Sequence, residues 1–441
     1  METKLYTGKR VGSGPGRQEI EQTVMKQVEA VAKERAQGLT LDSNIVELGL
    51  DSLERMDVIG RIGEIYSLQV PESVLPEIET CREISEAVLE RLQFTGPEDD
   101  IPLKSFQFEE MPEYRQLKTQ IVAAAAEGEA NPFFAVHDGV SNNLTRIDGR
   151  ELINFSGNNY LGMSGDPGVT QAGKAALDMY GTSISASRLA SGTRPLHNEL
   201  EKDLADVIGA EDSVTFTSGH STNATVIGHL MSRGDLIVHD ERVRNSIITG
   251  ALLSGADRRS FLHNDWELLN EILNRVRRNY RRVLVVIEGV YSMEGDYPDV
   301  PRFVEVKNRH VAWLMIDEAH SIGTMGRGGR GMVQFFDIES REIEIWMGTL
   351  SKAFGACGCY VAGSRPLIEY LKFTCPGAIF TIGLSPASAA AARYVIQHLQ
   401  DDRDRFSALH SPCRVLSLPL RATRFRYGCL SEHAHRTGDA R

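Results

Sequence analysis

The sequence has 441 residues, which is enough for two to four domains with buried cores. Its formal net charge of -12 argues against a protein that binds the phosphate backbone of nucleic acid. No apolar run approaches the ~20 residues that a membrane-spanning helix needs, so we expect neither nucleic acid nor a membrane as partner.

The chain begins with a polar, glycine-rich stretch, residues 1–17, without the apolar core of a signal peptide. Its six cysteines form no CxxC pair. Cys357 and Cys359 lie among small residues, and we interpret them as packing residues rather than metal ligands, so no metal is expected. These features are consistent with a reducing, cytoplasmic location.

Residues 18–94 are predicted to form a separate helical unit. Apolar residues recur at helical spacing from Glu19 to Ala36 and again after Ser52, and Ile84 and Val88 mark a last amphipathic helix. One interpretation is a small helical bundle in which Ser52 and the aspartate before it only cap a helix.

The stretch Leu48-Gly49-Leu50-Asp51-Ser52-Leu53 resembles the attachment motif of acyl carrier proteins. The resemblance implies an all-α four-helix carrier domain, with 4′-phosphopantetheine attached to Ser52 by a phosphopantetheinyl transferase. A prosthetic arm needs an exposed hydroxyl at a helix N-terminus, where backbone amides favour phosphate. The spacing and the size of the unit favour the carrier interpretation over the simple cap.

Residues 95–114 are predicted to be a linker. They contain Gly96-Pro97-Glu98-Asp99-Asp100 and three prolines, without helical or strand periodicity. A linker here would keep the carrier arm near an active site and raise its effective concentration there.

Residues 115–400 alternate between helical stretches, such as 263–278, and strand-like runs. This pattern predicts an α/β domain with a mainly parallel sheet covered by helices. The predicted strands are 214–217, 236–238, 283–287, 311–316 and 343–347.

A lysine follows the last of these strands, within the small-residue run from Gly348 to Gly358. Lys352 lies beside Thr349 and Ser351, which is a poor place for a solvated lysine but a good one for an amine that forms a Schiff base with an aldehyde. The hydroxyls can bind an anion, and the glycines let the backbone approach a flat ring. The alternative is an ordinary loop.

Asp317 ends the apolar run 311–316, and the carboxyl ends of strands carry the ligands in α/β sheets. An aspartate there can keep the ring nitrogen of pyridoxal phosphate (PLP) protonated, so that the ring accepts electrons. Taken alone, Asp317 is equally well explained as a helix cap. Together with Lys352, 35 positions later, it favours PLP.

Six motifs in a fixed order make the region from about 154 to 400 similar to the α-oxoamine synthases. These are PLP enzymes of fold type I (aminotransferase-like) that condense an amino acid with an acyl thioester. The motifs are Asn154–Gly162, Ser187–Leu189 with Gly192 and His197, Ser218–Asn223, Glu288–Asp296, Asp317–His320 and the stretch around Lys352.

The resemblance implies a role for each motif. Lys352 would attach PLP and act as the base, Asp317 would contact the ring nitrogen, and His320 would bond the phenolic oxygen of the ring. These three are the predicted catalytic residues, whereas His197 is interpreted as structural. The implied cofactor residues are Ser218, Gly219, His220, Arg244, Ser292, Asp317, His320, Thr349 and Lys352, and the implied substrate residues are Asn158, Glu288 and Arg414.

One position departs from the family pattern. The family places a histidine over the face of the PLP ring, and the 24-residue gap from His220 puts Arg244 at that position. Arginine can stack on an aromatic plane, but it cannot act as an acid or base near neutral pH. We therefore expect impaired chemistry.

The C-terminal region departs as well. Only 89 residues follow Lys352, too few for the small α/β domain that the family carries there, so we expect a shortened, atypical tail at 401–441. Arg414, in a stretch like a late family motif, is a candidate for gripping the substrate carboxylate. An internal deletion or a gene-model error would explain the spacing, and a disordered arginine-rich tail is the alternative.

The reaction implied by the resemblance joins an amino acid to an acyl group on the Ser52 arm, with loss of CO2, to give an α-amino ketone and a free carrier thiol. Fusion to a carrier favours a secondary-metabolite or polyketide-like pathway. Two alternatives stay open: a CoA-using aminoketone synthase with a vestigial carrier, and a degenerate, non-catalytic copy. The resemblance also implies a homodimer.

Overall fold

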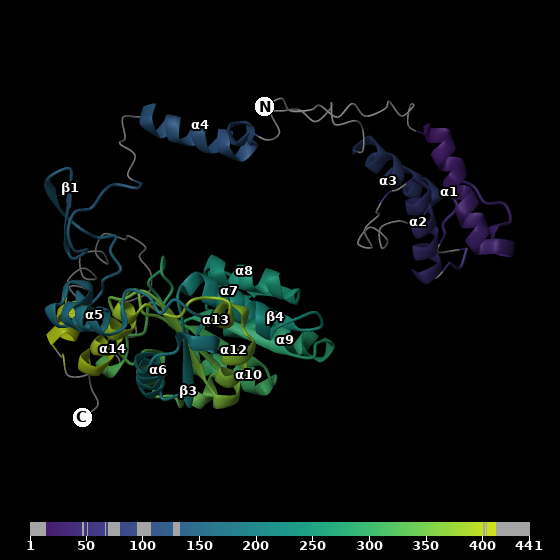
Figure 1. Ribbon diagram of the computed structural model, residues 1–441. Coiled ribbons are helices and arrows are strands. Elements are labelled where there is room, and N and C mark those ends of the chain that lie inside the picture. The colour runs from purple at the N-terminus through teal and green to yellow at the C-terminus, as the bar shows by residue number, and fades with distance from the viewer. Residues whose placement is uncertain are drawn as a thin grey trace, which may run out of the picture. The chain divides into compact units, whose positions relative to one another are not determined.

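The computed structural model describes residues 15–45, 48–50, 52–66, 68, 80–94, 107–126, 133–399, 402 and 404–411. The chain divides into two compact units, Met1–Phe133 and Phe134–Arg441 (Figure 1), and each is described by itself. Among the described residues, no helix is both long and apolar enough to cross a bilayer.

Among the described residues of the first unit, three of the helices share one apolar core. On the first helix Ile20, Val24 and Val28 are fully buried, and their four-residue spacing places them on one face. The predicted N-terminal helix is therefore confirmed, although its last turn is a 3-10 helix. The elements are α1 (Arg17–Ala32), η1 (Lys33–Ala36), α2 (Ser52–Tyr66) and α3 (Cys81–Phe94).

Ser52 is the first residue of α2, as the carrier motif predicts. Arg35 contacts both this helix and the segment that leads into it. Its Nη1 donates to the carbonyl oxygen of Gly49 at 2.6 Å, and its Nη2 lies 2.6 Å from Glu54 Oε1 on α2. Gly49 has a φ of 79°, which favours glycine. Asp51 and the side chain of Ser52 lie outside the described residues.

The predicted linker is described only from residue 107 onward. Its last residues contain η5 (Phe108–Glu110) and the start of α4 (Pro112–Ala126), so part of it is helical. The domain boundaries drawn from the sequence stay predictions.

The second unit is built on a seven-stranded sheet with the order β3-β9-β8-β7-β6-β4-β5. Strands β8, β7, β6, β4 and β5 run parallel, whereas β9 pairs antiparallel with both β8 and β3. Each of the five predicted strands overlaps a strand of this sheet. The strands are β3 (Asp212–Phe216), β4 (Leu236–Asp240), β5 (Asp257–Phe261), β6 (Val283–Glu288), β7 (Trp313–Asp317), β8 (Ile345–Thr349) and β9 (Cys359–Gly363), with a separate hairpin of β1 (Leu144–Ile147) and β2 (Arg150–Ile153).

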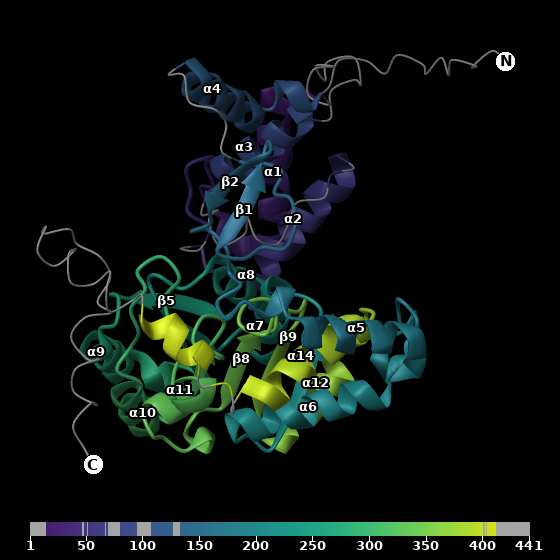
Figure 2. The same ribbon diagram turned by 90° about the vertical axis from the view of Figure 1, so that its left-hand side faces the viewer.

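Helices cover both faces of the sheet (Figures 1 and 2). One apolar core lies between the sheet and α6, α9, α10 and α14, and a second lies between the sheet and α7, α8 and α12. The mainly parallel, helix-covered sheet expected from the sequence is thereby confirmed. The helices are α5 (Pro167–Tyr180), α6 (Pro195–Ile208), α7 (Gly219–Leu230), α8 (Asn245–Ser254), α9 (Trp266–Val276), α10 (Val300–Arg309), α11 (Met332–Phe335), α12 (Arg365–Thr374), α13 (Pro376–Ile379) and α14 (Pro386–Leu399).

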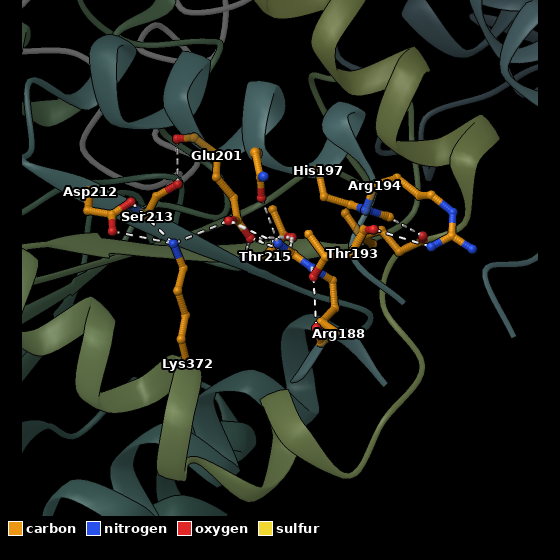
Figure 3. Close-up of polar contacts among 11 residues, drawn as sticks. Arg188, Thr193, Arg194, His197, Glu201, Asp212, Ser213, Thr215 and Lys372 are labelled. Atoms are coloured by element: carbon orange, nitrogen blue, oxygen red, sulfur yellow. Dashed lines mark hydrogen bonds and ion pairs between the residues drawn. The ribbon is translucent and has the colours of Figure 1, made fainter. Parts of the chain in front are cut away.

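A buried ion-pair cluster ties the segment before α6 to the sheet (Figure 3). Glu201 on α6 pairs with Arg188 and lies 3.3 Å from Lys372 Nζ, while its Oε1 accepts from the backbone N–H of Thr215 on β3 at 2.9 Å. His197 bonds the carbonyl oxygen of Leu384 at 2.9 Å through its Nε2. These contacts are consistent with the structural role predicted for His197.

Part of the predicted tail is helical and packs on the second unit. Residues 404–411 form this helical segment. Arg405 donates to the carbonyl oxygen of Leu161 at 2.9 Å and pairs with Asp166, the N-cap of α5. The segment therefore supports the loop that holds Asn158. Arg414 and the late motif around it lie outside the described residues.

Candidate active site

The candidate site lies where the parallel strands of the sheet end. Asp317 is the last residue of β7 and is 1% exposed. Its Oδ1 accepts from the N–H of Ala319 at 2.9 Å, and its Oδ2 accepts from Asn223 Nδ2 at 2.8 Å. These two donors hold the carboxylate in a fixed orientation at the edge of the sheet.

Lys352 lies in the loop after β8, with its Nζ 3.0 Å from His320 Nε2. Burial, followed by the positive charge of Arg244, lowers the pKa of Lys352 to about 8. An amine with this pKa is partly neutral near physiological pH, which is the form that attacks an aldehyde. The structure therefore supports the sequence prediction that Lys352 is a reactive amine.

His320 links this lysine to a tyrosine. The Tyr160 hydroxyl lies 2.7 Å from His320 Nδ1, on the opposite side of the ring from Lys352, and also donates to Asn158 Oδ1 at 3.4 Å. Burial, and then the charges of Lys352 and Arg244, lower the pKa of His320 to about 3. The imidazole is therefore neutral and acts as a fixed hydrogen-bonding group.

A second carboxylate stands beside Asp317. Glu288 ends β6 and is paired with Asp317 in the sheet register, so the two side chains emerge next to each other. Arg244 lies between them: its Nε is 3.4 Å from Asp317 Oδ2, and its Nη2 is 3.3 Å from Glu288 Oε2. Burial, and then the charge of Asp317, raise the pKa of Glu288 to about 7, against the opposing effect of Arg244.

The N-terminus of α7 lies close to the end of β8. Gly219 begins α7, and a Cβ atom placed on it would lie 3.9 Å from Thr349 Oγ1. The Thr349 hydroxyl is within 2.8 Å of Ser351 Oγ, and His220 is exposed on the first turn of the helix. Backbone amides of a helix start beside two hydroxyls suit a phosphate group.

A cavity of about 560 Å³ adjoins Lys352. It lies between α5 and α14, and Asn158, Lys174 and the exposed Cys357 also line it. Cys359 is buried on β9, in agreement with its prediction as a packing residue, whereas the same prediction for Cys357 is wrong because its side chain is exposed.

The structure brings together most of the residues predicted from the sequence, but not all of them. Arg244 pairs with Glu288 and Asp317, His320 contacts Lys352, and the charge of Arg244 lowers the pKa values of both His320 and Lys352, so the two sets act on each other. Ser292 is exposed in the loop after β6, and its predicted role stays untested.

The sequence analysis missed two residues that contact this group. Tyr160 and Asn223 both stand inside motifs already singled out, so membership of those motifs was the available signal. Only the fold shows that their side chains reach His320 and Asp317.

The residues present fit PLP. A ring nitrogen requires a buried carboxylate, an aldehyde requires a partly neutral lysine, and a phosphate requires free amides and hydroxyls. Asp317, Lys352 and the start of α7 with Thr349 provide these groups at one edge of the sheet. The fold and the site therefore define a PLP-dependent transferase.

Comparison with known families agrees. The family described as aminotransferase class I and II matches residues 150–416, and the family described as a phosphopantetheine attachment site matches residues 22–88. The chain belongs to the aminotransferase class I and II family and carries a phosphopantetheine-attachment unit ahead of it. The predicted carrier domain, fold class and two cofactors are thereby confirmed.

Two relatives bear the name of one enzyme. A protein of Trichormus variabilis, provisionally named 8-amino-7-oxononanoate synthase, is 43% identical over 256 residues, which are 58% of this chain and 66% of that protein. An 8-amino-7-oxononanoate synthase of Symbiobacterium thermophilum is 40% identical over 263 residues, which are 60% of this chain and 67% of that protein. The chain thus spans about two thirds of the length of these relatives.

Solved structures give the same result. Serine palmitoyltransferase of Sphingomonas wittichii is 33% identical with a TM-score of 0.69, covering 73% of this chain and 80% of the other. The enzyme of S. paucimobilis, solved with a bound PLP–myriocin aldimine, is 32% identical with the same TM-score, covering 72% and 80%. The predicted resemblance to α-oxoamine synthases, which are PLP-dependent acyltransferases, is confirmed at the level of the family.

Proposed function

We propose that this chain catalyses the decarboxylative condensation of an amino acid with an acyl thioester carried on the phosphopantetheine arm of Ser52. The products are an α-amino ketone, CO2 and the free carrier thiol. The observation that carries the proposal is the pairing of Lys352 with neutral His320 beside buried Asp317, in a chain that also contains a phosphopantetheine-attachment unit.

PLP would be held by Lys352, by Asp317 at its ring nitrogen, and at its phosphate by the start of α7 with Thr349. When bound, it supplies a ring that accepts the electron pair left on the α-carbon after a proton or CO2 departs. The Lys352 amine, with a pKa of about 8, can take up and return a proton at that carbon. His320, fixed by Tyr160, holds the lysine in place through its Nε2.

The carrier unit supplies the acyl group. Ser52 stands at the start of α2, where a phosphodiester is favoured by the helix N-terminus. A phosphopantetheinyl transferase must load this serine, and the tether raises the effective concentration of the acyl group. By analogy with its family we also propose a homodimer in the cytoplasm, with the amino acid bound near Asn158 and Glu288.

Two other functions are separated from this one by experiment. A CoA-using enzyme with a vestigial carrier would keep its activity with acyl-CoA when Ser52 is replaced by alanine. A degenerate copy, which Arg244 favours, would bind PLP poorly or turn over no substrate. If the proposed reaction is right, Ser52→Ala is inactive, and the wild type is active only when its phosphopantetheine arm is acylated.

The first test is the absorbance spectrum of the purified chain with PLP, before and after addition of candidate amino acids. We expect a band from lysine-bound cofactor that Lys352→Ala abolishes and that one amino acid shifts. Lys174→Ala, at the other side of the cavity, is the matched control and should keep the band. A folded wild type without a band would overturn the proposal.

Turnover of Arg244→His beside the wild type tests the departure from the family. We expect a gain, because histidine can exchange a proton near neutral pH and arginine cannot. Equal or lower turnover in the variant would show that Arg244 does not impair the chemistry.

A further inference from the structure

His263 lies between two aspartates that come from different segments of the second unit. Its Nδ1 is 3.1 Å from Oδ1 of Asp240, the last residue of β4, and its Nε2 is 2.9 Å from Oδ2 of Asp296, at the end of loop 289–296. The Asp240 side chain is fully buried, and those of His263 and Asp296 are each 15% exposed. The imidazole therefore bridges two segments that are far apart in the sequence.

Both ring nitrogens of His263 have to donate a hydrogen bond. A carboxylate only accepts, and a neutral imidazole has a single N–H, so carboxylates at opposite ring nitrogens require the imidazolium. Asn264 Nδ2 also lies 3.3 Å from Nε2, but the two Asp296 oxygens are closer, at 3.1 and 2.9 Å. An unprotonated Nε2 would turn its lone pair toward these oxygens.

The surrounding groups stabilise this positive charge. Burial raises the pKa of Asp240, but the donors His263, Asn264 N–H at 2.7 Å and Arg242 N–H at 2.9 Å outweigh burial and hold that pKa below its usual range. Burial likewise lowers the pKa of His263, but the hydrogen bonds to Asp240 and Asp296, and their charges, raise it above its ordinary value. Asp240 is therefore ionised and faces a protonated ring.

The bridge lies next to the candidate active site. The loop begins directly after Glu288, and its buried Tyr291 meets the His263 ring edge to face, with centroids 4.5 Å apart. On the side of β4, the His263 N–H donates to Glu241 Oε1 at 3.3 Å, and three residues later the Arg244 N–H donates to Glu288 Oε1 at 2.7 Å. His263 is thus packed between the segments that carry Arg244 and Glu288.

We propose that His263, as an imidazolium, clamps loop 289–296 to the carboxyl end of β4 and thereby positions Arg244 against Glu288, and that the clamp opens when the ring loses its proton. A neutral ring donates to only one of the two carboxylates and repels the other. His263 is accordingly a positioning residue. Because the clamp consists of protein groups alone, the inference does not rest on the proposed reaction.

The pH range follows from the direction in which the pKa moves. A histidine whose pKa is raised in the folded chain keeps its full contribution below the ordinary value of 6.5. That contribution is lost as the pH rises through the raised value. We therefore expect a closed clamp at pH 6 and an open one at pH 9.

Hydrogen exchange of the full chain, measured by mass spectrometry, tests the clamp. The reporters are three amides: Tyr291 and Gly295, which are bonded within the loop, and Arg244, which is bonded to Glu288. We expect their exchange in the wild type, corrected for its intrinsic pH dependence, to rise roughly 10-fold or more between pH 6 and pH 9, because a charge-assisted hydrogen bond is lost.

Asp296→Asn is the decisive variant. Its amide can donate to Nε2 of a neutral ring while Nδ1–H still donates to Asp240, so both bonds persist at either pH and the three amides should stay protected at pH 9. Glu288 ionises over the same range in both chains, so its effect on the Arg244 amide cancels when the variant is compared with the wild type at one pH.

Two further variants complete the set. Arg242→Gln is the control, because it breaks an exposed ion pair with Glu294 at 2.9 Å that joins the same two segments, and it should keep the pH dependence of the wild type. His263→Ala should raise exchange at pH 6 to the level of the wild type at pH 9.

Either of two results would overturn the inference: equal corrected exchange at pH 6 and pH 9 in the wild type, or an Asp296→Asn variant that shows the same rise as the wild type. Neither result needs His263→Ala, so the test stands even where that variant does not fold. The exchange measurement involves neither attachment of PLP nor turnover. Failure of the proposed function therefore leaves the clamp standing, and an absent clamp leaves the proposed function intact.

Discussion

Two buried arginine–carboxylate clusters in the second unit differ in how completely their carboxylates are neutralised. Glu201 accepts from Arg188, lies near Lys372 and also accepts from the backbone of Thr215. Burial alone would raise its pKa, but these cations and donors hold the pKa of Glu201 below its usual range. Two cations there neutralise Glu201, and one of them, Lys372, also pairs with Asp212 at 3.3 Å.

The carboxylates of the candidate active site are less completely neutralised. Glu288 and Asp317 share the single guanidinium of Arg244 at 3.3 and 3.4 Å. The pKa of Glu288 rises to about 7, because burial and the neighbouring Asp317 outweigh Arg244. A fully neutralised cluster stabilises a fold, whereas an under-neutralised one leaves charge for a ligand to satisfy.

The same substitution in the two clusters tests this difference most strongly. Glu201→Gln removes the carboxylate that neutralises Arg188 and leaves this buried guanidinium unneutralised, while Lys372 keeps Asp212. We expect the free energy of unfolding to fall by about 3–5 kcal/mol, measured by urea denaturation of the PLP-free chain at pH 7. Glu199→Gln, two residues along α6, is half exposed and pairs with Arg393, so its cost should stay under about 1 kcal/mol. Equal costs for the two variants would contradict a structural role for Glu201.

A second buried glutamate, Glu318, should make the stability of the folded chain depend on pH. Glu318 is fully buried beside Asp317; its Oε1 accepts from the Met332 N–H at 2.6 Å, and its Oε2 has no partner among the described atoms. Burial raises its pKa to about 8 despite that donor. The native carboxyl thus keeps a proton that the unfolded chain has already released, so stability falls as pH rises from ~4.5 to about 8.

Glu318→Gln should remove this dependence, since the amide stays neutral and still accepts from Met332. Between pH 6 and 8 the wild type should lose about 2 kcal/mol relative to the variant, followed by urea denaturation at each pH. Glu305→Gln, an exposed site on α10, should run parallel to the wild type. Parallel curves for Glu318→Gln and the wild type would mean that Glu318 is ionised in the folded chain.

The positions of the residues in the sequence decide how much of each cluster could be predicted. Asp317 and Lys352 each follow an apolar run, and the carboxyl ends of strands meet at one edge, so their proximity could be predicted. Arg244 could be placed by its spacing from a motif. The contact of Arg244 with both carboxylates could not be predicted, because that contact depends on the strand register that pairs Glu288 with Asp317.

Glu201 and Glu318 show why the remainder could not be predicted. Glu201 lies in the charged run Glu199-Leu200-Glu201-Lys202-Asp203, which is typical of a solvated helix face. Only the packing of α6 on β3 buries it. Strands β5 and β9 were missed for a related reason, since Arg258 and Arg259 interrupt the first and the second directly follows the small-residue run that ends at Gly358.

The smallest expected effect on stability is that of Glu288 in the candidate active site. Between pH 6 and 7 the wild type should lose about 1 kcal/mol of unfolding free energy relative to Glu288→Gln, because folded Glu288, with a pKa of about 7, keeps a proton that the unfolded chain, with a pKa near 4.5, has already released. The measurement is the same urea denaturation, run beside Glu201→Gln. Raising the pH from 7 to 8 should add less than about 1 kcal/mol to this difference, since Glu288 is then largely ionised in both the folded and the unfolded chain. A loss comparable to that of Glu201→Gln would mean that the site cluster also holds the fold together, and its charges would not be available to a ligand.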